Sequence, residues 1–255
     1  MIDALIQLSG ETRGWFAAAA LVFLRVGAAM AMLPGFGEQS IPARIRLVLA
    51  FAFTAIVTPS VQGQLPPDQG LIWPIMTEAV IGLALGAVLR LFIQVLQMAG
   101  TMAAQATSLS QFFGGAGVEP QPAIAQILMI AGFALAVATG LHVRLAQALI
   151  LSYDMLPPGR FPGAGDLSRW GIAHIAYAFA LAFTLAAPFV IAATIYNAAL
   201  GAINRAMPQL MVAFVGAPAL TFGGLFLLMI AAPLMLGLWT DAFSAFLANP
   251  FRMPR

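Results

Sequence analysis

The sequence has no cysteine, no lysine and very little charge of either sign. The lack of cysteine excludes disulfides, thiolate nucleophiles and cysteine-ligated zinc. Only 8% of the 255 residues are charged, whereas about a quarter are charged in a typical soluble domain. Hydrophobic residues make up 62% of the chain, and the few polar and charged residues could not cover so much apolar surface in water. We therefore predict an integral membrane protein.

The sequence also has no basic cluster of the kind that binds nucleic acid. All 11 basic residues are arginines, the net charge is only +2, and Arg44 with Arg46 forms the densest pair. Binding to nucleic acid relies on many Lys and Arg side chains that neutralise neighbouring phosphates. We therefore expect no nucleic-acid partner.

No motif for catalysis or metal binding stands out. His142 and His174 are far apart in the chain, with no carboxylate at ligand spacing beside either, and a metal site needs a cluster of ligands. The glycine-rich run at 114–117 is not followed by the Lys and Ser or Thr of a phosphate-binding loop. We predict no catalytic, cofactor or metal site and no enzymatic activity.

Long apolar stretches dominate the chain. A helix needs about 20 apolar residues to cross a bilayer, and six stretches reach or approach that length: 14–33, 45–61, 71–99, 123–152, 170–203 and 209–247. The composition does not shift along the chain, so we predict one membrane-embedded, all-α domain over residues 1–255. Pro188 in the fifth stretch and Pro218 and Pro233 in the sixth predict broken helices.

Charged residues inside these stretches need a partner. A charge at membrane depth costs about 2.5–3.5 kcal/mol and normally faces protein or water. Arg25 lies in the first stretch, Glu78 and Arg90 in the third, and Arg144 in the fourth. For Glu78 three interpretations stay open: an ion pair with an arginine of another segment, proton transfer, or a position at the membrane interface near Trp73.

Glu78 and Arg90 cannot pair with each other along one continuous helix. They are twelve residues apart, which is about 18 Å at 1.5 Å per residue. Each needs another partner, and a partner chain is a natural source. The candidate subunit-contact charges are Glu78, Arg90, Arg144 and Arg205.

A polar stripe follows in the third segment. Its members lie three or four residues apart and so share one helix face: Gln94, Gln97, Thr101, Gln105 and Ser108. In lipid such a face must meet water, another polar helix or a pore. Interhelix hydrogen bonding and the lining of an aqueous conduit are both open interpretations.

The stripe leads into a loop of glycine and aromatic residues. Within 108–122 lie Phe112, Phe113, Gly114, Gly115 and Gly117. Flexible glycine beside bulky aromatics suits a segment that blocks a passage and moves aside, and it equally suits an ordinary connector. Elsewhere, small residues at helical spacing, as in Gly82/Gly86 and Gly132/Ala136/Gly140, allow close helix packing.

Three blocks of sequence carry a family resemblance. The first covers 25–60 and includes the run IPARIR at 41–46 and the end of the apolar stretch at TPS. The second is EAVIGLALG at 78–86, followed by the glutamine-bearing helix. The third joins NRAMPQL at 204–210 to FVGAP at 214–218. In these blocks, and in length and segment order, the chain resembles the FliR family of flagellar export-gate membrane proteins, whose injectisome counterparts are known as SctT.

The resemblance implies a role in protein export. Members of this family assemble with FliP-like and FliQ-like chains into a gate in the bacterial inner membrane, at the flagellar basal body, and their helices form bent hairpins. Unfolded flagellar proteins pass through its centre, driven by the proton motive force, a separate ATPase and FlhA-like and FlhB-like proteins. By the same resemblance, residues 106–122 correspond to the loop that plugs the closed pore.

A proton-coupled secondary transporter is the alternative function. Its motivation is the set of prolines at 188, 218 and 233, which would break helices around a midplane site, with Glu78 as the proton carrier. Against it, the two halves of the sequence show no visible repeat.

Overall fold

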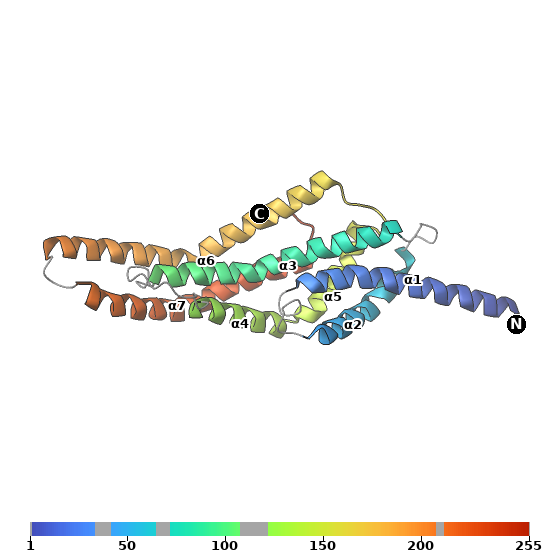
Figure 1. The fold of residues 1–255 in the computed structure, drawn as a ribbon, viewed down its shortest axis with the longest axis horizontal. Coiled ribbons are helices and arrows are strands. Elements are labelled where there is room, and N and C mark those ends of the chain that lie inside the picture. Colours follow the sequence, from blue (N-terminus) through green and yellow to red (C-terminus); the bar gives the residue numbers. More distant parts are fainter. Residues whose placement is uncertain (1, 34–41, 65–71, 108–121, 208–211, 255) are drawn as a thin grey trace. The chain divides into compact units, whose positions relative to one another are not determined.

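The computed structural model describes residues 2–33, 42–64, 72–107, 122–207 and 212–254. Within these ranges every regular element is helical, which confirms the predicted all-α class. The elements are α1 (Ile2–Met32), α2 (Ala43–Val61), the short 3₁₀ helix η1 (Gln62–Gln64), α3 (Ile72–Thr107), α4 (Ala123–Ala138), α5 (Leu141–Met155), α6 (Ala164–Ala206) and α7 (Val212–Ala248) (Figure 1).

Most of these helices are long and apolar enough to cross a membrane. Five qualify singly, namely Gly14–Met32 of α1, all of α2, Trp73–Thr107 of α3, all of α6 and Pro218–Ala248 of α7. Helices α4 and α5 qualify together as a pair bent by 74°. The six predicted apolar segments thus correspond to five single helices and one bent pair.

The structure corrects the expected position of the interruptions. Pro188 lies inside α6, and Pro218 and Pro233 lie inside α7, yet neither helix ends at a proline. Membrane helices tolerate proline because neighbouring groups can satisfy the freed carbonyl. A sharp break lies between α4 and α5, where Gly140 has a φ of 84°. Glycine adopts this left-handed conformation at little steric cost.

The helices group into two compact units, each built from separate stretches of the chain. The first comprises Met1–Leu91, Gly140–Ile175 and Ser244–Arg255. The second comprises Phe92–Thr139 and Ala176–Phe243. Helices α3, α6 and α7 therefore contribute to both units, and the single domain over 1–255 stays a prediction.

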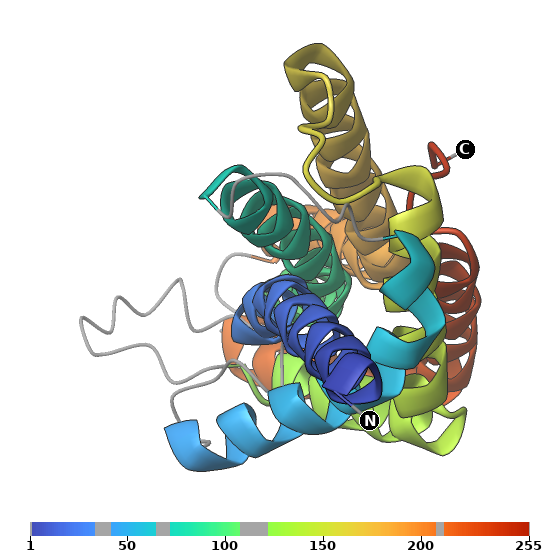
Figure 2. The same ribbon diagram turned by 90° about the vertical axis from the view of Figure 1, so that its right-hand side faces the viewer.

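In the first unit α1 lies directly against the first half of α3 (Figure 2). Gly82 and Gly86 face the contact, where an added Cβ would collide with the carbonyl oxygens of Arg25 and Ala29 on α1. Small residues one turn apart let two helix backbones approach closely. The packing role predicted for Gly82 and Gly86 is therefore confirmed.

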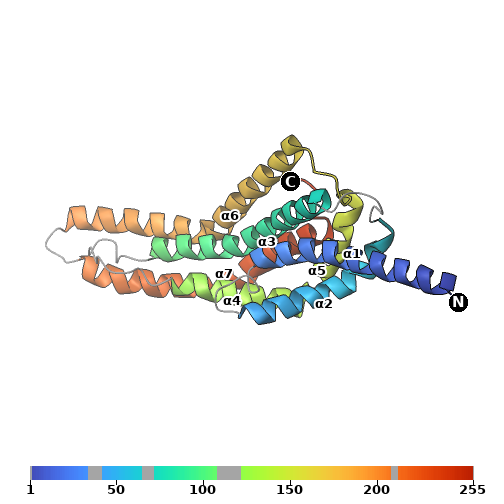
Figure 3. The same cartoon turned by 45° about the vertical axis from the view of Figure 1, so that its right-hand side comes forward.

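Helix α2 packs against α1 and α5 in the same unit (Figure 3). Phe51 stacks on Phe23 of α1 with ring centroids 4.7 Å apart. The buried face of α2 follows helical spacing and consists of Ala50, Phe53, Thr54, Val57, Thr58 and Val61. The hydroxyls of Thr54 and Thr58 each donate to a carbonyl one turn earlier at 2.7 Å, so these buried polar groups are satisfied.

In the second unit α3 and α4 form an antiparallel pair. Gly100 of α3 lies against Ala125 at the start of α4, whereas Leu96 lies against Gly132 further along α4. Contacts that move forward on one helix move backward on the other, which defines a hairpin-like arrangement. At Gly100 the glycine lets the two backbones approach closely, whereas Gly132 leaves room for the Leu96 side chain.

Helices α6 and α7 form a second antiparallel pair. The Tyr196 hydroxyl of α6 donates to the carbonyl oxygen of Gly216 on α7 at 2.8 Å. Further along α7, Trp239 is fully buried and its Nε1–H donates to the carbonyl oxygen of Phe92 on α3 at 2.6 Å. Trp239 also stacks on Phe243, with ring centroids 5.1 Å apart. This tryptophan gives the second unit a large anchored core residue.

Candidate functional site

A pair of opposite charges lies at the centre of the first unit. Arg25 of α1 and Glu78 of α3 are both 0% exposed. Gly82 stands one turn after Glu78 on the same face of α3, and it lets the α1 backbone at Arg25 come close to α3. The close packing of the two helices therefore brings the guanidinium to the carboxylate.

The two groups meet in a side-on geometry. Arg25 Nε donates to Glu78 Oε2 at 2.7 Å, and Arg25 Nη2 donates to Glu78 Oε1 at 2.8 Å. Two parallel hydrogen bonds between a planar guanidinium and a carboxylate are short, strong and directional. This geometry fixes the rotation of α1 against α3 as well as the distance between them.

Helix α5 completes the site. Arg25 Nη1 donates to the Ser152 hydroxyl, and Arg25 Nη2 donates to the carbonyl oxygen of Leu156, both at 2.9 Å. The Tyr153 hydroxyl donates to Glu78 Oε2 at 3.0 Å. The Tyr153 ring also lies under the guanidinium, with Arg25 Cζ 3.7 Å from the ring centroid, which adds a cation–π attraction.

The energetics favour a structural role for this cluster. Removing one partner of a buried ion pair typically costs about 3–5 kcal/mol, because it leaves an unpaired charge in a medium of low dielectric. Here Arg25 and Glu78 are tied to each other and to Ser152, Tyr153 and Leu156. The cluster therefore holds α1, α3 and α5 in one arrangement within the first unit.

The loop after α5 is fastened to the same part of α3. The backbone N–H of Gly159 donates to the Thr77 hydroxyl at 3.2 Å, and that hydroxyl donates to the carbonyl oxygen of Pro74 at 2.8 Å. Gly159 has a φ of 76°, a conformation that favours glycine. Phe161 meets Trp73 edge to face at a centroid distance of 5.0 Å. These contacts keep the carbonyl of Leu156 within reach of Arg25.

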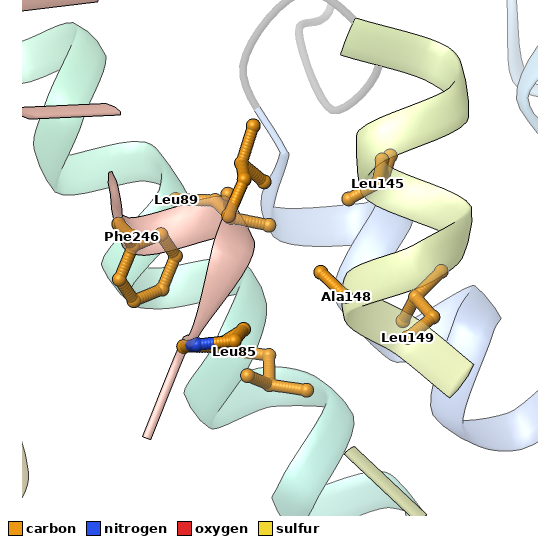
Figure 4. Close-up of a pocket in the computed structure, with 8 residues that line it drawn as sticks. Leu85, Leu89, Leu145, Ala148, Leu149 and Phe246 are labelled. Atoms are coloured by element: carbon orange, nitrogen blue, oxygen red, sulfur yellow. The ribbon is translucent and has the colours of Figure 1, made fainter. Parts of the chain in front are cut away.

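A small apolar cavity lies later on α3 and earlier on α5 than this cluster, against the C-terminal end of α7 (Figure 4). Its volume is about 10 Å³, and its lining consists of Leu85, Leu89, Leu145, Ala148, Leu149, Phe246, Leu247 and Pro250. A space of this size holds at most about one water molecule, and an apolar lining offers that water no partner. The cavity is a packing defect and not a ligand site.

The predicted contact charges have different surroundings. For Glu78, the structure shows the first of the three interpretations, an ion pair with an arginine of another segment. This partner belongs to the same chain and the pair is fully buried, and a contact of Glu78 with a partner subunit stays a prediction. Arg144 is half-buried and its Nη1 donates to the Ser244 hydroxyl. Arg90 and Arg205 are exposed, and their contact role stays a prediction.

The polar stripe lies on α3 in the second unit. Gln94, Gln97 and Thr101 are half-buried and Gln105 is exposed, while Ser108 lies outside the described residues. The Thr101 hydroxyl donates to the carbonyl oxygen of Gln97 at 2.8 Å. The predicted loop residues Phe112, Phe113, Gly114, Gly115 and Gly117 also lie outside the described residues.

Sequence reasoning did not assign Arg25 as the partner of Glu78. The signal was present, because Arg25 and Glu78 are opposite charges in two different apolar segments, and charges in such segments tend to pair. Nothing in the sequence indicated that Ser152 would bind Arg25 or that Tyr153 would bind Glu78. His174, which the sequence left as a packing or hydrogen-bonding residue, is buried, with Nδ1 2.8 Å from the carbonyl oxygen of Trp170.

Comparison with known proteins assigns the family. The family described as "Bacterial export proteins, family 1" matches residues 16–246, which run from α1 into α7. A relative from Caulobacter vibrioides named flagellar biosynthetic protein FliR is 36% identical over 231 residues, which cover 88% of this chain and 92% of the relative.

More distant relatives with the same name come from other bacteria. The protein from Bacillus subtilis is 30% identical, over 80% of this chain and 81% of the relative. The protein from Escherichia coli is 27% identical, over 91% of this chain and 90% of the relative. Because the match covers nearly the whole length on both sides, the chain belongs to the FliR family within the bacterial export proteins of family 1.

Proposed function

We propose that the chain is a subunit of the flagellar-type (type III) protein export gate. With FliP-like and FliQ-like chains it forms the channel through which unfolded flagellar proteins cross the bacterial inner membrane at the flagellar basal body. The observation that carries this proposal is the match of residues 16–246 to the bacterial export proteins, together with relatives named flagellar biosynthetic protein FliR along most of their length.

In this proposal the chain has no enzymatic turnover. FlhA-like and FlhB-like proteins act beside it, and the energy for transport comes from the proton motive force and a separate ATPase. The comparisons give no support to the alternative of a proton-coupled transporter. Glu78 is ion-paired with Arg25 and accepts a hydrogen bond from the Tyr153 hydroxyl, which also favours a structural role for this carboxylate over proton transport.

The second half of α3 supports a surface that meets the conduit or another subunit. Gln94 and Gln97 are half-buried and Gln105 is exposed, on a helix otherwise apolar enough to span the membrane. Amide side chains in lipid would lack partners, so a stripe of them favours a polar or hydrated surrounding. The stripe leads into 108–121, where we propose that Phe112, Phe113 and the neighbouring glycines close the pore.

The exposed arginines suit contacts with other gate subunits. Arg90 lies inside the apolar span Trp73–Thr107 and is exposed in this chain. An exposed charge on such a span normally meets protein or water. Arg205 is exposed in the last turn of α6, where a cation also interacts favourably with the helix dipole.

A purification from the native host tests the proposal. The tagged chain is extracted in a mild detergent, and its partners are identified by mass spectrometry, with an unrelated tagged inner-membrane protein as the control. We expect FliP-like and FliQ-like chains to co-purify in one large complex with the tagged chain and not with the control. A monodisperse particle of this chain alone, from cells that express the apparatus, would contradict the proposal.

A further inference from the structure

Helix α7 has two faces with different surroundings in the second unit. One face packs inward, and Leu220, Leu228, Met235 and Trp239 on it are buried. The opposite face is not covered by any other described helix of the unit, as the exposure of Ile230 (58%) shows. The helix as a whole is apolar enough to span a membrane over Pro218–Ala248.

The outer face of α7 has the spacing of a helix-packing seam. Its members follow one another at alternating steps of four and three: Gly223, Leu227, Ile230, Leu234, Gly237 and Asp241. All of them are exposed except Leu227, which is half-buried. Steps of three and four keep side chains on one side of a helix and are the spacing by which two helices pack side by side.

Asp241 is the charged member of this face. It lies inside the apolar span Pro218–Ala248 and is exposed. Among the residues that the structure describes, the ion pairs Arg25–Glu78 and Arg169–Asp166 do not include Asp241, and no hydrogen bond to its carboxylate is found there either. Carboxylates within spanning helices normally pair with a cation or face water, and a lipid tail offers neither.

Two glycines on the same face are open, with no neighbour among the described residues against them. A Cβ added to Gly223 or to Gly237 would meet nothing within 4 Å. Glycine in a helix interior is less favourable than alanine, so the two positions lower helix stability without a gain inside this chain. Small residues at such sites let the backbone of a second helix approach closely.

We propose that the outer face of α7, formed by Gly223, Leu227, Ile230, Leu234, Gly237 and Asp241, docks a transmembrane helix of another gate subunit. That helix places a Lys or Arg side chain against Asp241. Charge complementarity selects this occupant over a lipid tail, and the open glycines provide the space for its backbone. The inference rests on the proposed function, because it takes the partner from the export gate.

Photo-crosslinking in native membranes tests the surface. A photoreactive benzophenone amino acid replaces Leu234 in the full-length chain, and Met229 is the matched control. Both side chains are 67% exposed on α7, but five residues separate them, which turns Met229 about 140° away from the seam at 3.6 residues per turn. We expect position 234, and not position 229, to give a discrete adduct with a gate subunit, mapped to one of its transmembrane helices.

The charge is tested by substitution at Asp241. Loss of one partner of a desolvated charge pair weakens association strongly, so Asp241→Asn should lower the yield of the adduct from position 234 about tenfold or more. Asp241→Glu keeps the charge and should retain most of the yield. Asp241→Lys should abolish the adduct, and exchange of the partner's basic residue for Asp should restore it.

The outcomes separate this inference from the proposed function. If the wild-type chain carries FliP-like and FliQ-like partners but position 234 reacts only with lipid or with a second copy of this chain, the docking surface is refuted and the gate assignment stands. Equal adducts from positions 234 and 229, or an unchanged yield in Asp241→Asn, also refute it. A wild-type chain that purifies without any partner refutes the gate assignment itself.

Discussion

Arg25 of α1 and Glu78 of α3 form a bidentate ion pair, with nitrogen–oxygen distances of 2.7 and 2.8 Å, although 53 positions separate them in the sequence. Both side chains are completely buried. Glu78 would be an uncompensated charge without this partner, and Arg25 would be one in the middle of an apolar helix. The packing of α1 in the first unit therefore depends on the ion pair that joins it to α3.

Neutralising one partner of this pair should destabilise the protein strongly. We expect Arg25→Met or Glu78→Leu to lower the free energy of unfolding by about 3–5 kcal/mol, because each leaves the other charge buried and unpaired. The double variant should recover most of this loss, since an apolar pair of similar volume needs no counter-charge. Unfolding of the purified chain in detergent measures all three.

The exposed pair Asp166–Arg169 provides the control for this experiment. Its side chains are more than two-thirds exposed, at 77% and 72%, and such surface pairs contribute little. Asp166→Asn should leave the unfolding transition in place. If Arg25→Met unfolds at the same point as Asp166→Asn, the buried pair does not stabilise the first unit.

Tyr153 should contribute through both its hydroxyl and its ring. Tyr153→Phe removes the hydrogen bond to Glu78 Oε2 but keeps the ring under Arg25. A hydrogen bond to a charged group contributes about 1.5–3 kcal/mol, and we expect a loss in that range. Tyr153→Leu should cost more, because the cation–π contact is lost as well. Equal stabilities of the two variants in thermal unfolding would show that the ring contact contributes nothing.

The close approach of α1 to α3 should not tolerate a side chain at Gly82. An added Cβ would collide with the carbonyl oxygen of Arg25, so Gly82→Ala must push α1 away and stretch the ion pair to Glu78. Gly171 in α6 is the matched control, because a Cβ there would meet nothing within 4 Å. Gly171→Ala should leave the chain as stable or slightly more stable, since alanine is the better helix former by about 1 kcal/mol.

Thermal unfolding of both glycine variants in the same detergent distinguishes these effects. A Gly82→Ala variant as stable as Gly171→Ala would mean that the two backbones can separate without cost. In that case the bidentate geometry of Arg25 and Glu78 would not depend on close packing. The Cβ of Ala28 also faces Gly82. A second substitution at Ala28 should not restore the stability of Gly82→Ala, because the added Cβ collides with the backbone carbonyl of Arg25.

The sequence was sufficient for features that depend on neighbouring residues. The polar face of α3 at Gln94, Gln97 and Thr101 followed from local spacing, and the packing of Gly82 and Gly86 followed from the one-turn interval. Apolar length alone predicted the spanning helices. These patterns are visible because helix periodicity places residues three and four apart on one face whatever the tertiary fold.

Features that depend on distant residues could not be derived in the same way. Arg25 could have paired with any carboxylate of another segment or subunit, and only the packing of α1 on α3 selects Glu78. Breaks were expected at Pro188, Pro218 and Pro233 because proline lacks a backbone donor, but α6 and α7 continue past these residues. A bend of 74° separates α4 from α5. It occurs at Gly140, one of 24 glycines, and no local pattern distinguishes that glycine from the others.

The loop that follows the polar stripe allows a direct test of gating. Residues 114–117, which lie between Phe113 and Val118, include three glycines of the proposed plug. Their deletion should leave the gate assembled, because it touches neither Arg25–Glu78 nor the described helix contacts. It should also make the membrane permeable to ions, because a shortened loop cannot close the passage.

Ion flux across native membranes measures the permeability, and co-purification of FliP-like and FliQ-like chains confirms that the deleted gate still assembles. A deletion of equal length at 65–68, between η1 and α3, is the control for a shortened connector away from the stripe. We expect leakage only from the 114–117 deletion. An assembled 114–117 variant with the ion permeability of the wild type would assign the loop to a connector, since a plug that can be shortened without leakage does not seal the pore.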